Sequence, residues 1–339
     1  MRHARILFIT KSNQTYGFQN YCRKNSGLWV STSYVVRALR SHGIHADLVE
    51  VTDNNDIDRE VTKHKPEVVI LEALWVVPEK FDVLKQLHPN VRWFCHLHSN
   101  IPFLAGEGIA VEWLRGYVSR GIGLIANSEP ARQSLQTFLD CEADVLYLPN
   151  IYDREMLTPK KSEDLHTLNV GCFGAVRPMK NQLVQAVAAL AFARYLGKHL
   201  AFHINAARVE SGGDQCLRNL RAFFAENDEA ELVEHPWYEP RDFMRVLRRE
   251  IDFGMQVSLS ETFNIVAADY VAAGLPIVVS REVPWASSWN HADTDSASDI
   301  THVMKRAYGN RLLIYWNQHL LRKYSAESLE RWLEFSRTR

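Results

Sequence analysis

The most constraining segment of the chain runs from residue 251 to residue 280, where an apolar strand, a turn, a helix and a second apolar strand follow one another. Ile251–Val257 predicts a buried strand, Gly-Leu-Pro from Gly274 predicts the end of the helix, and Ile277–Val279 predicts the next strand. Glu261 in the turn and Asp269 two turns along the helix would lie on nearly the same face. Such a pair can hold paired hydroxyl groups of one sugar. The alternative is two solvated acids on an ordinary strand and helix.

Short apolar runs alternate with helical patterns along the whole chain, which is typical of parallel sheets with helices on both faces. In the first half the predicted strands are Ile6–Ile9, Ala46–Val51, Val68–Leu71, Arg92–Cys95, Gly123–Ala126 and Asp144–Leu148. In the second half they are Asn169–Phe173, Ala201–Asn205, Glu231–Glu234, Ile251–Val257 and Ile277–Val279. The sequence ends in two predicted helices, Asp299–Tyr308 and Ala326–Ser336. The fold class predicted is α/β, with two doubly wound domains.

The domain boundary is predicted from a break in this periodicity. A chain of 339 residues exceeds the usual size of one domain. Pro149, Pro159 and the polar run at 160–164 interrupt the pattern. We therefore expect a first domain over residues 1–150, a linker over 151–165 and a second domain over 166–339, with a cleft between the domains.

Charge and composition exclude several classes of protein. Lys and Arg number 39 against 40 Asp and Glu, so the net charge of -1 gives no overall attraction to nucleic acid or to an anionic membrane. The five cysteines are scattered, without a C-x-x-C pair, which favours reduced thiols. The N-terminal apolar run is too short for a signal peptide, and no segment has the length of a membrane span. We expect a soluble, cytoplasmic enzyme.

A loop suited to a diphosphate is predicted at the start of the second domain. Residues 171–182 join a strand to a helix and include Gly174, Arg177 and Lys180. Amide groups at a helix start attract anions, and the two cations can neutralise charge that develops on a leaving nucleotide. The alternative is a surface turn with two solvated cations.

Two histidines follow the fourth predicted strand in the sequence His-Leu-His. Because side chains alternate along a strand, His96 and His98 are expected to point the same way, with His98 the more exposed. A metal site would need further ligands, and no acidic or cysteine partner has a suitable spacing, so no metal is expected. The alternative is a capping or core histidine.

The segment around Glu261 resembles the E-x7-E signature of retaining nucleotide-sugar glycosyltransferases with the GT-B fold, the large family-four group. Members of that family commonly read Ser-x-x-Glu-x-Phe-Gly, then four residues, Glu-Ala and Gly-x-Pro. Asp269 stands where the family usually has Glu, and Asn264 stands where it usually has Gly. Lys180 with the following Asn matches the phosphate loop of the family, whereas Arg177 lies two residues after the usual arginine position.

This resemblance implies a donor-binding set in the second domain. Asp269 would accept hydrogen bonds from the ribose of the nucleotide, and Glu261 would hold hydroxyls of the transferred sugar. The amides around Phe263, Asn264 and Ile265 would face sugar and phosphate.

The resemblance also implies roles for residues on both sides of the cleft. Lys180 and Arg177 would bind the diphosphate, with the backbone at Gly174 close by. In the first domain, the loop from Thr10 to Leu28 would bring Gly27 near the donor phosphate, and His98 would contact the sugar near its reacting carbon. His98, Lys180 and Glu261 are the candidate catalytic residues.

The implied reaction is a metal-independent, retaining transfer from a nucleotide-diphosphate sugar to a hydroxyl acceptor by front-face attack. The nucleotide sugar is a cosubstrate, and no cofactor is expected. Rival interpretations are a GT-B nucleotide-sugar epimerase and a non-catalytic nucleotide-sugar-binding module. A further alternative is glycosylation of hydroxylated bases in DNA, for which the chain offers a possible basic patch of Arg23, Lys24, Arg37 and Arg40.

Overall fold

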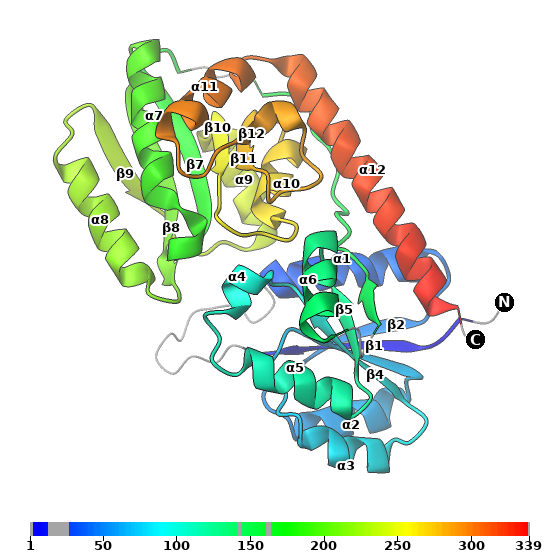
Figure 1. Cartoon of the computed structure of the whole chain (residues 1–339). Helices are drawn as coiled ribbons and strands as arrows, with labels where there is room; N and C mark the ends of the chain where they lie inside the picture. Colours follow the sequence, from blue (N-terminus) through cyan, green and yellow to red (C-terminus); the bar gives the residue numbers. More distant parts are fainter. Residues whose placement is uncertain (1–2, 13–26, 141–143, 161–163, 338–339) are drawn as a thin grey trace. The chain divides into compact units, whose positions relative to one another are not determined.

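The computed structural model describes residues 3–12, 27–140, 144–160 and 164–337 of the chain (Figure 1). The chain divides into two units. Unit 1 comprises Met1–Asp153 and Tyr324–Arg339, and unit 2 comprises Arg154–Lys323. Each unit contains a sheet of six parallel strands with helices packed against it. This is the doubly wound α/β architecture that the alternating pattern predicts.

The sheet of unit 1 has the strand order β2-β1-β3-β4-β5-β6. Its strands are β1 (Ile6–Lys11), β2 (Ala46–Val51), β3 (Val68–Glu72), β4 (Arg92–Leu97), β5 (Gly123–Ala126) and β6 (Val145–Tyr147). Ile6 of β1 is opposite Ala46 on one side and Val68 on the other. The strand order therefore reverses between β1 and β3.

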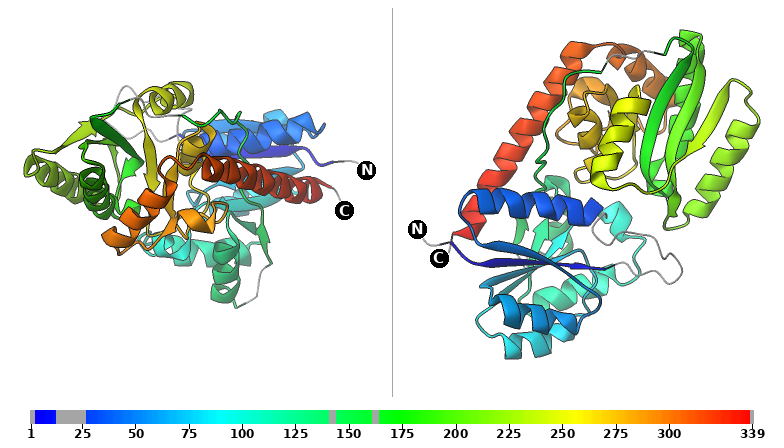
Figure 2. Two further views of the ribbon diagram at one scale, coloured as in Figure 1. Left: turned by 90° about the horizontal axis from the view of Figure 1, so that it is seen from above. Right: turned by 180° about the vertical axis from the view of Figure 1, so that it is seen from behind.

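Helices cover both faces of this sheet. They are α1 (Gly27–Ser41), α2 (Asp56–His64), α3 (Lys80–Leu87), α4 (Ile101–Leu104), α5 (Ala110–Ser119) and α6 (Glu129–Phe138). Buried side chains of α2, α3, α5 and α6 form one core with the sheet, and α1 contributes to the core on the other face. The described ends of the chain meet at this unit, where His3 and Arg337 form an isolated bridge (Figure 2).

The sheet of unit 2 has the strand order β12-β11-β10-β7-β8-β9. Its strands are β7 (Thr167–Val176), β8 (His199–Val209), β9 (Ala230–Glu234), β10 (Phe253–Gln256), β11 (Ile277–Ser280) and β12 (His291–Ala292). The helical elements are η1 (Pro178–Lys180), α7 (Gln182–Leu196), α8 (Gly213–Ala225), α9 (Pro240–Glu250), α10 (Ile265–Ala272), η2 (Ser288–Asn290) and α11 (Ala297–Ala307). The order reverses between β7 and β10. Open parallel sheets bind ligands outside the carboxyl ends of their strands at such a reversal.

The last helix, α12 (Arg311–Ser336), is longer than the sequence predicted. It has 26 residues, whereas the sequence pattern predicted a helix only from Ala326. No Gly or Pro interrupts the segment, so nothing in the chain stops the helix. Exposed apolar side chains at Leu312, Tyr315 and Trp316 blur the amphipathic pattern by which its first half would be recognised. Residues 311–323 belong to unit 2 and residues 324–336 to unit 1.

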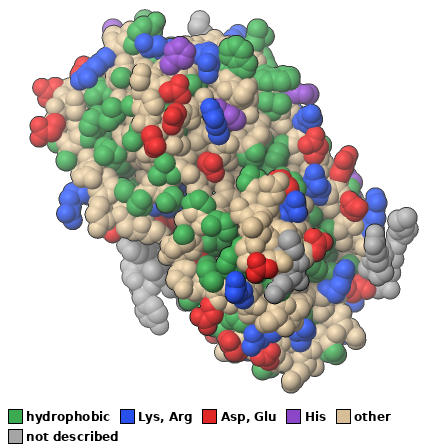
Figure 3. All heavy atoms as spheres, in the orientation of Figure 1, with side chains coloured by type: hydrophobic (Ala, Val, Ile, Leu, Met, Phe, Trp, Pro, Cys, Tyr) green, Lys and Arg blue, Asp and Glu red, His purple; other side chains and the backbone are tan. Residues whose placement is uncertain are grey.

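Charged side chains of both signs are interspersed on the face drawn in Figure 3. Two arginines of the possible basic patch already have acidic partners. Arg37 lies 3.1 Å from Asp153, and Arg40 lies 2.5 Å from Asp47. The other two residues of that patch, Arg23 and Lys24, lie outside the described residues. Within the described part of the chain, no helix is long and apolar enough to cross a membrane.

Trp332 provides a test of how strongly α12 holds unit 1 together. Its side chain is fully buried, its Nε1–H donates to the carbonyl oxygen of Pro149 at 2.8 Å, and its ring centroid lies 5.6 Å from that of Phe8. We expect Trp332→Ala to lower the free energy of unfolding by about 3–5 kcal/mol, because it leaves a large cavity. The control Trp316→Ala removes a ring that is 50% exposed and should cost less than about 1 kcal/mol. Equal losses in urea unfolding would contradict this account.

Candidate active site

Lys180 lies at the reversal of strand order in unit 2. β7 ends at Val176, η1 carries Lys180, and Asn181, with φ 55°, turns the chain into α7. Only 8% of Lys180 is exposed. Its Nζ donates to Oε1 of Glu261 at 2.5 Å and to Oε1 of Gln256 at 3.3 Å. The structure thus brings together a cation and a carboxylate that the sequence separates by 81 positions.

Gln256 is a site residue that sequence reasoning missed. It is 1% exposed and is the last residue of β10. Its Oε1 accepts from Lys180 and from Nδ2 of Asn264, and its Nε2 donates to the carbonyl oxygen of Phe173 at 2.8 Å. A buried amide needs such partners. The available signal was one uncharged polar residue inside the apolar run 251–257.

The backbone conformation of Asn264 explains why Asn can stand at a position where the family that the sequence resembles usually has Gly. Its φ of 59° lies in the left-handed region, which favours Gly and which Asn tolerates better than most residues. Its Oδ1 accepts from the N–H of Ala267 at 2.9 Å and so caps α10. Ile265 is the first residue of that helix. Phe263 is buried, and its carbonyl oxygen accepts from Nε1 of Trp285 at 2.7 Å.

Asp269 is the fifth residue of α10, a little over one turn from the start of the helix rather than two turns as predicted. The reason is that the chain from Glu261 to Asn264 is not helical. Asp269 is 8% exposed, and its Oδ1 lies 3.6 Å from Nε of Arg154. Arg154 is a second residue that sequence reasoning did not select, because it lies 115 positions away in the predicted linker.

Gly174 and Arg177 are placed by β7. Gly174 has φ 113°, and a Cβ there would lie 3.5 Å from Cε of Lys180. Its N–H donates to Oδ1 of Asn205 at 3.0 Å. Nη1 of Arg177 lies 3.4 Å from Oε2 of Glu210, which follows β8. Of the two cations in this loop, Lys180 is the one paired with Glu261.

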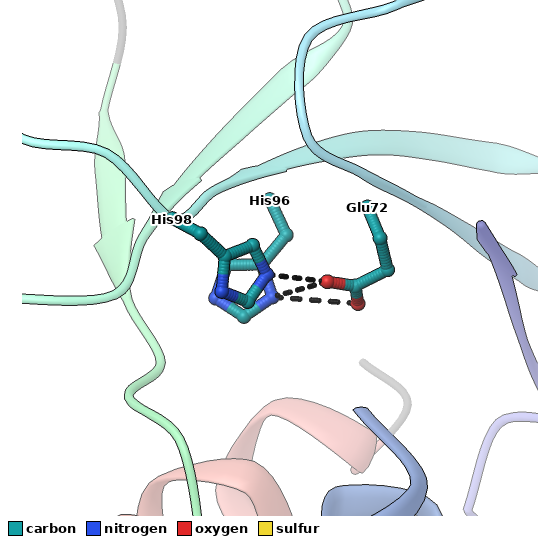
Figure 4. A group of neighbouring side chains, drawn as sticks. All are labelled: Glu72, His96 and His98. Carbon is teal, nitrogen blue, oxygen red and sulfur yellow. Dashed lines mark hydrogen bonds and ion pairs between the residues drawn. The ribbon is translucent and has the colours of Figure 1, made fainter. Parts of the chain in front are cut away.

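The candidate residues of unit 1 lie at the carboxyl ends of β3 and β4. Nε2 of His98 donates to Oε2 of Glu72 at 2.5 Å (Figure 4). Nδ1 of His96 lies 3.4 Å from Oε1 and 3.3 Å from Oε2 of the same carboxylate. Glu72 is opposite His96 in the parallel register, a relation that the linear sequence does not reveal. Gly27 is the first residue of α1, and residues 13–26 of its loop lie outside the described residues.

The electrostatics of this cluster set the protonation of His98. Burial by itself raises the pKa of Glu72, but His96 and His98 outweigh it and lower that pKa to about 2. Burial and the nearby His96 lower the pKa of His98, although Glu72 opposes the shift. Near neutral pH an ionised carboxylate therefore accepts the Nε2–H of a neutral His98. Its Nδ1 is then the unprotonated ring nitrogen.

A chain of hydrogen bonds runs from Tyr238 through two histidines to Asn169 on β7, and its donors and acceptors can be assigned at every step. Nδ2 of Asn169 donates to Asp252, so its Oδ1 accepts from Nε2–H of His203 at 3.2 Å. Nδ1 of His203 then accepts from Nε2–H of His235 at 2.8 Å. Nδ1 of His235 accepts from the hydroxyl of Tyr238 at 2.7 Å. Both rings are thus neutral, with all four nitrogens in use, and burial lowers the pKa of His203 to about 3.

The backbone at Asn264 can be tested with a matched pair of variants. Asn264→Gly and Asn264→Ala both lose the cap and the contact with Gln256, and they differ mainly in the strain of a Cβ at positive φ. We expect Asn264→Ala to be less stable than Asn264→Gly by about 1–2 kcal/mol in urea unfolding. Equal stability of the two variants would show that the left-handed conformation is not imposed here.

The lowered pKa of His203 predicts that the stability of the fold depends on pH. In the unfolded chain His203 takes up a proton as the pH falls through about 6.5, whereas the folded ring stays neutral down to about pH 3. The stabilisation is therefore complete above pH ~6.5 and is lost as the pH falls toward 3. We expect His203→Gln to reduce the slope of unfolding free energy against pH by about 1 kcal/mol per unit between pH ~4.5 and ~6.5. If His203→Gln has the same slope of unfolding free energy against pH as the parent protein in that range, the lowered pKa of His203 is contradicted.

Comparisons with known proteins find similar structures but no similar sequence. The sequence matches no protein-family model and no curated protein with which it was compared. The structure is similar to OtsA, a trehalose-6-phosphate synthase, with TM-score 0.67, 11% identity and 97% of each chain covered. It is also similar to a sucrose-phosphate synthase from Thermosynechococcus elongatus, with TM-score 0.65, 12% identity, and 98% of this chain and 95% of that chain covered.

A third similar structure is a UDP-forming α,α-trehalose-phosphate synthase from Burkholderia xenovorans in complex with glucose-6-phosphate. Its TM-score is 0.68 at 10% identity, with 97% of this chain and 99% of that chain covered. These likenesses extend over both units. The predicted fold class, two Rossmann-like domains of the GT-B type, is confirmed.

Proposed function

We propose that the chain is a retaining glycosyltransferase that moves a hexose from a nucleotide-diphosphate sugar to a hydroxyl acceptor. The observation that carries the proposal is the contact between Lys180 and Glu261 at the carboxyl ends of β7 and β10. Both side chains are only 10% exposed, and they lie where an open parallel sheet binds ligands. The shared fold with trehalose-phosphate and sucrose-phosphate synthases, one of them described as UDP-forming, supports the proposed reaction class.

Lys180 is suited to bind the diphosphate of the donor. An ammonium group has three N–H donors, and Glu261 and Gln256 accept two of them. The third can be donated to a phosphate oxygen without breaking either contact. As the glycosidic bond breaks, negative charge grows on the leaving phosphate, and a cation already held in place stabilises that charge without reorganisation.

The two carboxylates are suited to hold hydroxyl groups. Oε1 of Glu261 accepts from Lys180, and we propose that this carboxylate also accepts from hydroxyls of the transferred sugar, since a carboxylate can accept several hydrogen bonds. Asp269 is proposed to accept from the ribose, and Arg154 beside it balances the charge of that buried carboxylate.

The proposed chemistry uses no metal ion and no enzymic nucleophile. The acceptor oxygen attacks the anomeric carbon from the side on which the diphosphate leaves, so the configuration is retained. The carbon–oxygen bond to the diphosphate breaks, and an oxygen of the leaving phosphate takes the acceptor proton. Lys180 supplies positive charge to that phosphate, which is the role a divalent cation plays in other phosphate sites. Neither Glu261 nor Asp269 acts as a general base.

The test is a paired substitution that removes both charges at once. Lys180→Met with Glu261→Gln removes both charges of this pair together, so neither is left unpaired by the loss of the other and the fold should persist. We expect the affinity for UDP and UDP-glucose, measured by calorimetry, to fall at least about tenfold, which is about 1.4 kcal/mol. The matched control, Arg221→Met with Glu234→Gln, removes an ion pair of the same unit whose side chains are 57% and 34% exposed. It should bind like the parent protein.

Unchanged nucleotide affinity in the Lys180 and Glu261 double variant would overturn the donor assignment. The reaction type is tested separately by donor consumption. A transferase consumes UDP-glucose in proportion to added acceptor, whereas an epimerase converts the donor without one. Saturable nucleotide binding without consumption over a broad acceptor screen would indicate a non-catalytic binding protein.

A further inference from the structure

Within the described residues, two groups of three His and carboxylate side chains bring one ligand atom each within 4.8 Å of one another. One is Glu72, His96 and His98 in unit 1, and the other is His203, His235 and Glu250 in unit 2. Sequence reasoning predicted no metal site at the His-x-His pair because it found no acidic partner. The structure supplies that partner in Glu72.

We propose that Glu72, His96 and His98 form a binding site for one divalent transition-metal ion of the Zn²⁺ type. Two imidazoles and one carboxylate are a ligand set that such ions prefer. Both imidazoles direct a ring nitrogen at the carboxylate of Glu72, as Figure 4 shows, and one ligand atom of each side chain lies within 4.8 Å of the others. They come from the end of β3, from β4 and from the residue following β4, so the backbone that carries them is held by a parallel sheet.

The separation of His96 from Glu72 fits two ligands of a tetrahedral ion. Bonds of about 2.0–2.1 Å to nitrogen and oxygen place neighbouring ligands about 3.3–3.4 Å apart. Nδ1 of His96 already lies 3.3 and 3.4 Å from the two carboxylate oxygens of Glu72. The separation of Nε2 of His98 from Glu72 is 2.5 Å, a hydrogen-bond distance. For an ion to bind, Nε2 of His98 must lose its proton while Nδ1 gains one, so that the ring stays neutral. The side chain must also move away from Glu72, because 2.5 Å is shorter than the separation of about 3.3 Å between two ligands of a tetrahedral ion.

Two of the three proposed ligands are buried, and the third is partly exposed to solvent. Glu72 and His96 are each 1% exposed at the side chain, whereas His98 is 15% exposed. An ion can therefore enter past His98 and then be held by two side chains that solvent does not reach. Three protein ligands leave the fourth tetrahedral position to water or to an oxygen of a bound molecule. Nε2 of His96 has no hydrogen-bond partner among the described residues, so this ligand lacks the outer contact that strengthens many metal sites.

The second group does not form a comparable site. The ring nitrogens of His203 and His235 are all used in the chain from Asn169 to Tyr238. An ion there would break the direct contact between the two rings, and Glu250 is exposed to water. This group therefore serves as an internal control with the same residue types and similar spacing.

The experiment measures metal binding by the full-length protein after removal of metal with a chelator. Zn²⁺ is titrated by calorimetry, and Co²⁺ is followed by the strong visible absorption of a tetrahedral ion. We expect one ion per chain, with an affinity that Glu72→Gln and His98→Ala each lower by at least tenfold, while His235→Gln leaves it unchanged. No donor or acceptor is present, so failure of this proposal and failure of the proposed transfer reaction are separate results.

Absence of saturable one-to-one Zn²⁺ binding below about 0.1 mM in the parent protein would overturn the proposal. Binding that both Glu72→Gln and His98→Ala retain in full, or that His235→Gln abolishes, would overturn it as well. Circular dichroism checks that each variant is folded. Because His98 is partly exposed, His98→Ala decides the outcome if Glu72→Gln does not fold.

Discussion

Lys180 is a cation almost wholly removed from water, and the surrounding part of unit 2 is arranged to provide its partners. A buried ammonium group is costly unless it is paired and hydrogen-bonded. Glu261 supplies the opposite charge, and Gln256 connects Lys180 to Asn264 and to the carbonyl oxygen of Phe173. The turn after β10 and the start of α10 are thereby tied to the loop after β7. A site of this kind is preorganised, since its polar groups are positioned before a ligand arrives.

The two units show how parallel register gathers residues that are distant in sequence. In unit 2 the reversal between β7 and β10 brings Lys180 to Glu261. In unit 1 the pairing of β3 with β4 places Glu72 opposite His96, two residues before His98. In both cases a carboxylate and a nitrogen-bearing side chain meet at the carboxyl edge of the sheet. The same topology thus produces the cluster that we propose binds a phosphorylated ligand and the cluster that we propose binds a metal ion.

The sequence predicted eleven of the twelve strands that the described residues form, in their order, because apolar runs depend on neighbouring residues. It did not predict β12, which has only two residues. Lys180 and Glu261 were predicted as site residues from local motifs, and the structure places them in contact. Gln256, Glu72 and Arg154 were not selected, because their importance arises from pairing across strands or from the linker. The sequence also placed Asp269 one turn too far along its helix. The spacing between Glu261 and Asp269 does not show at which residue the turn ends and the helix begins.

The most direct test of the central claim is a crystal structure of the protein with UDP-glucose. The account predicts a diphosphate oxygen within about 3 Å of Nζ of Lys180, a sugar hydroxyl on Glu261, and the ribose on Asp269. A nucleotide bound elsewhere, without contact to Lys180 or Glu261, would contradict it.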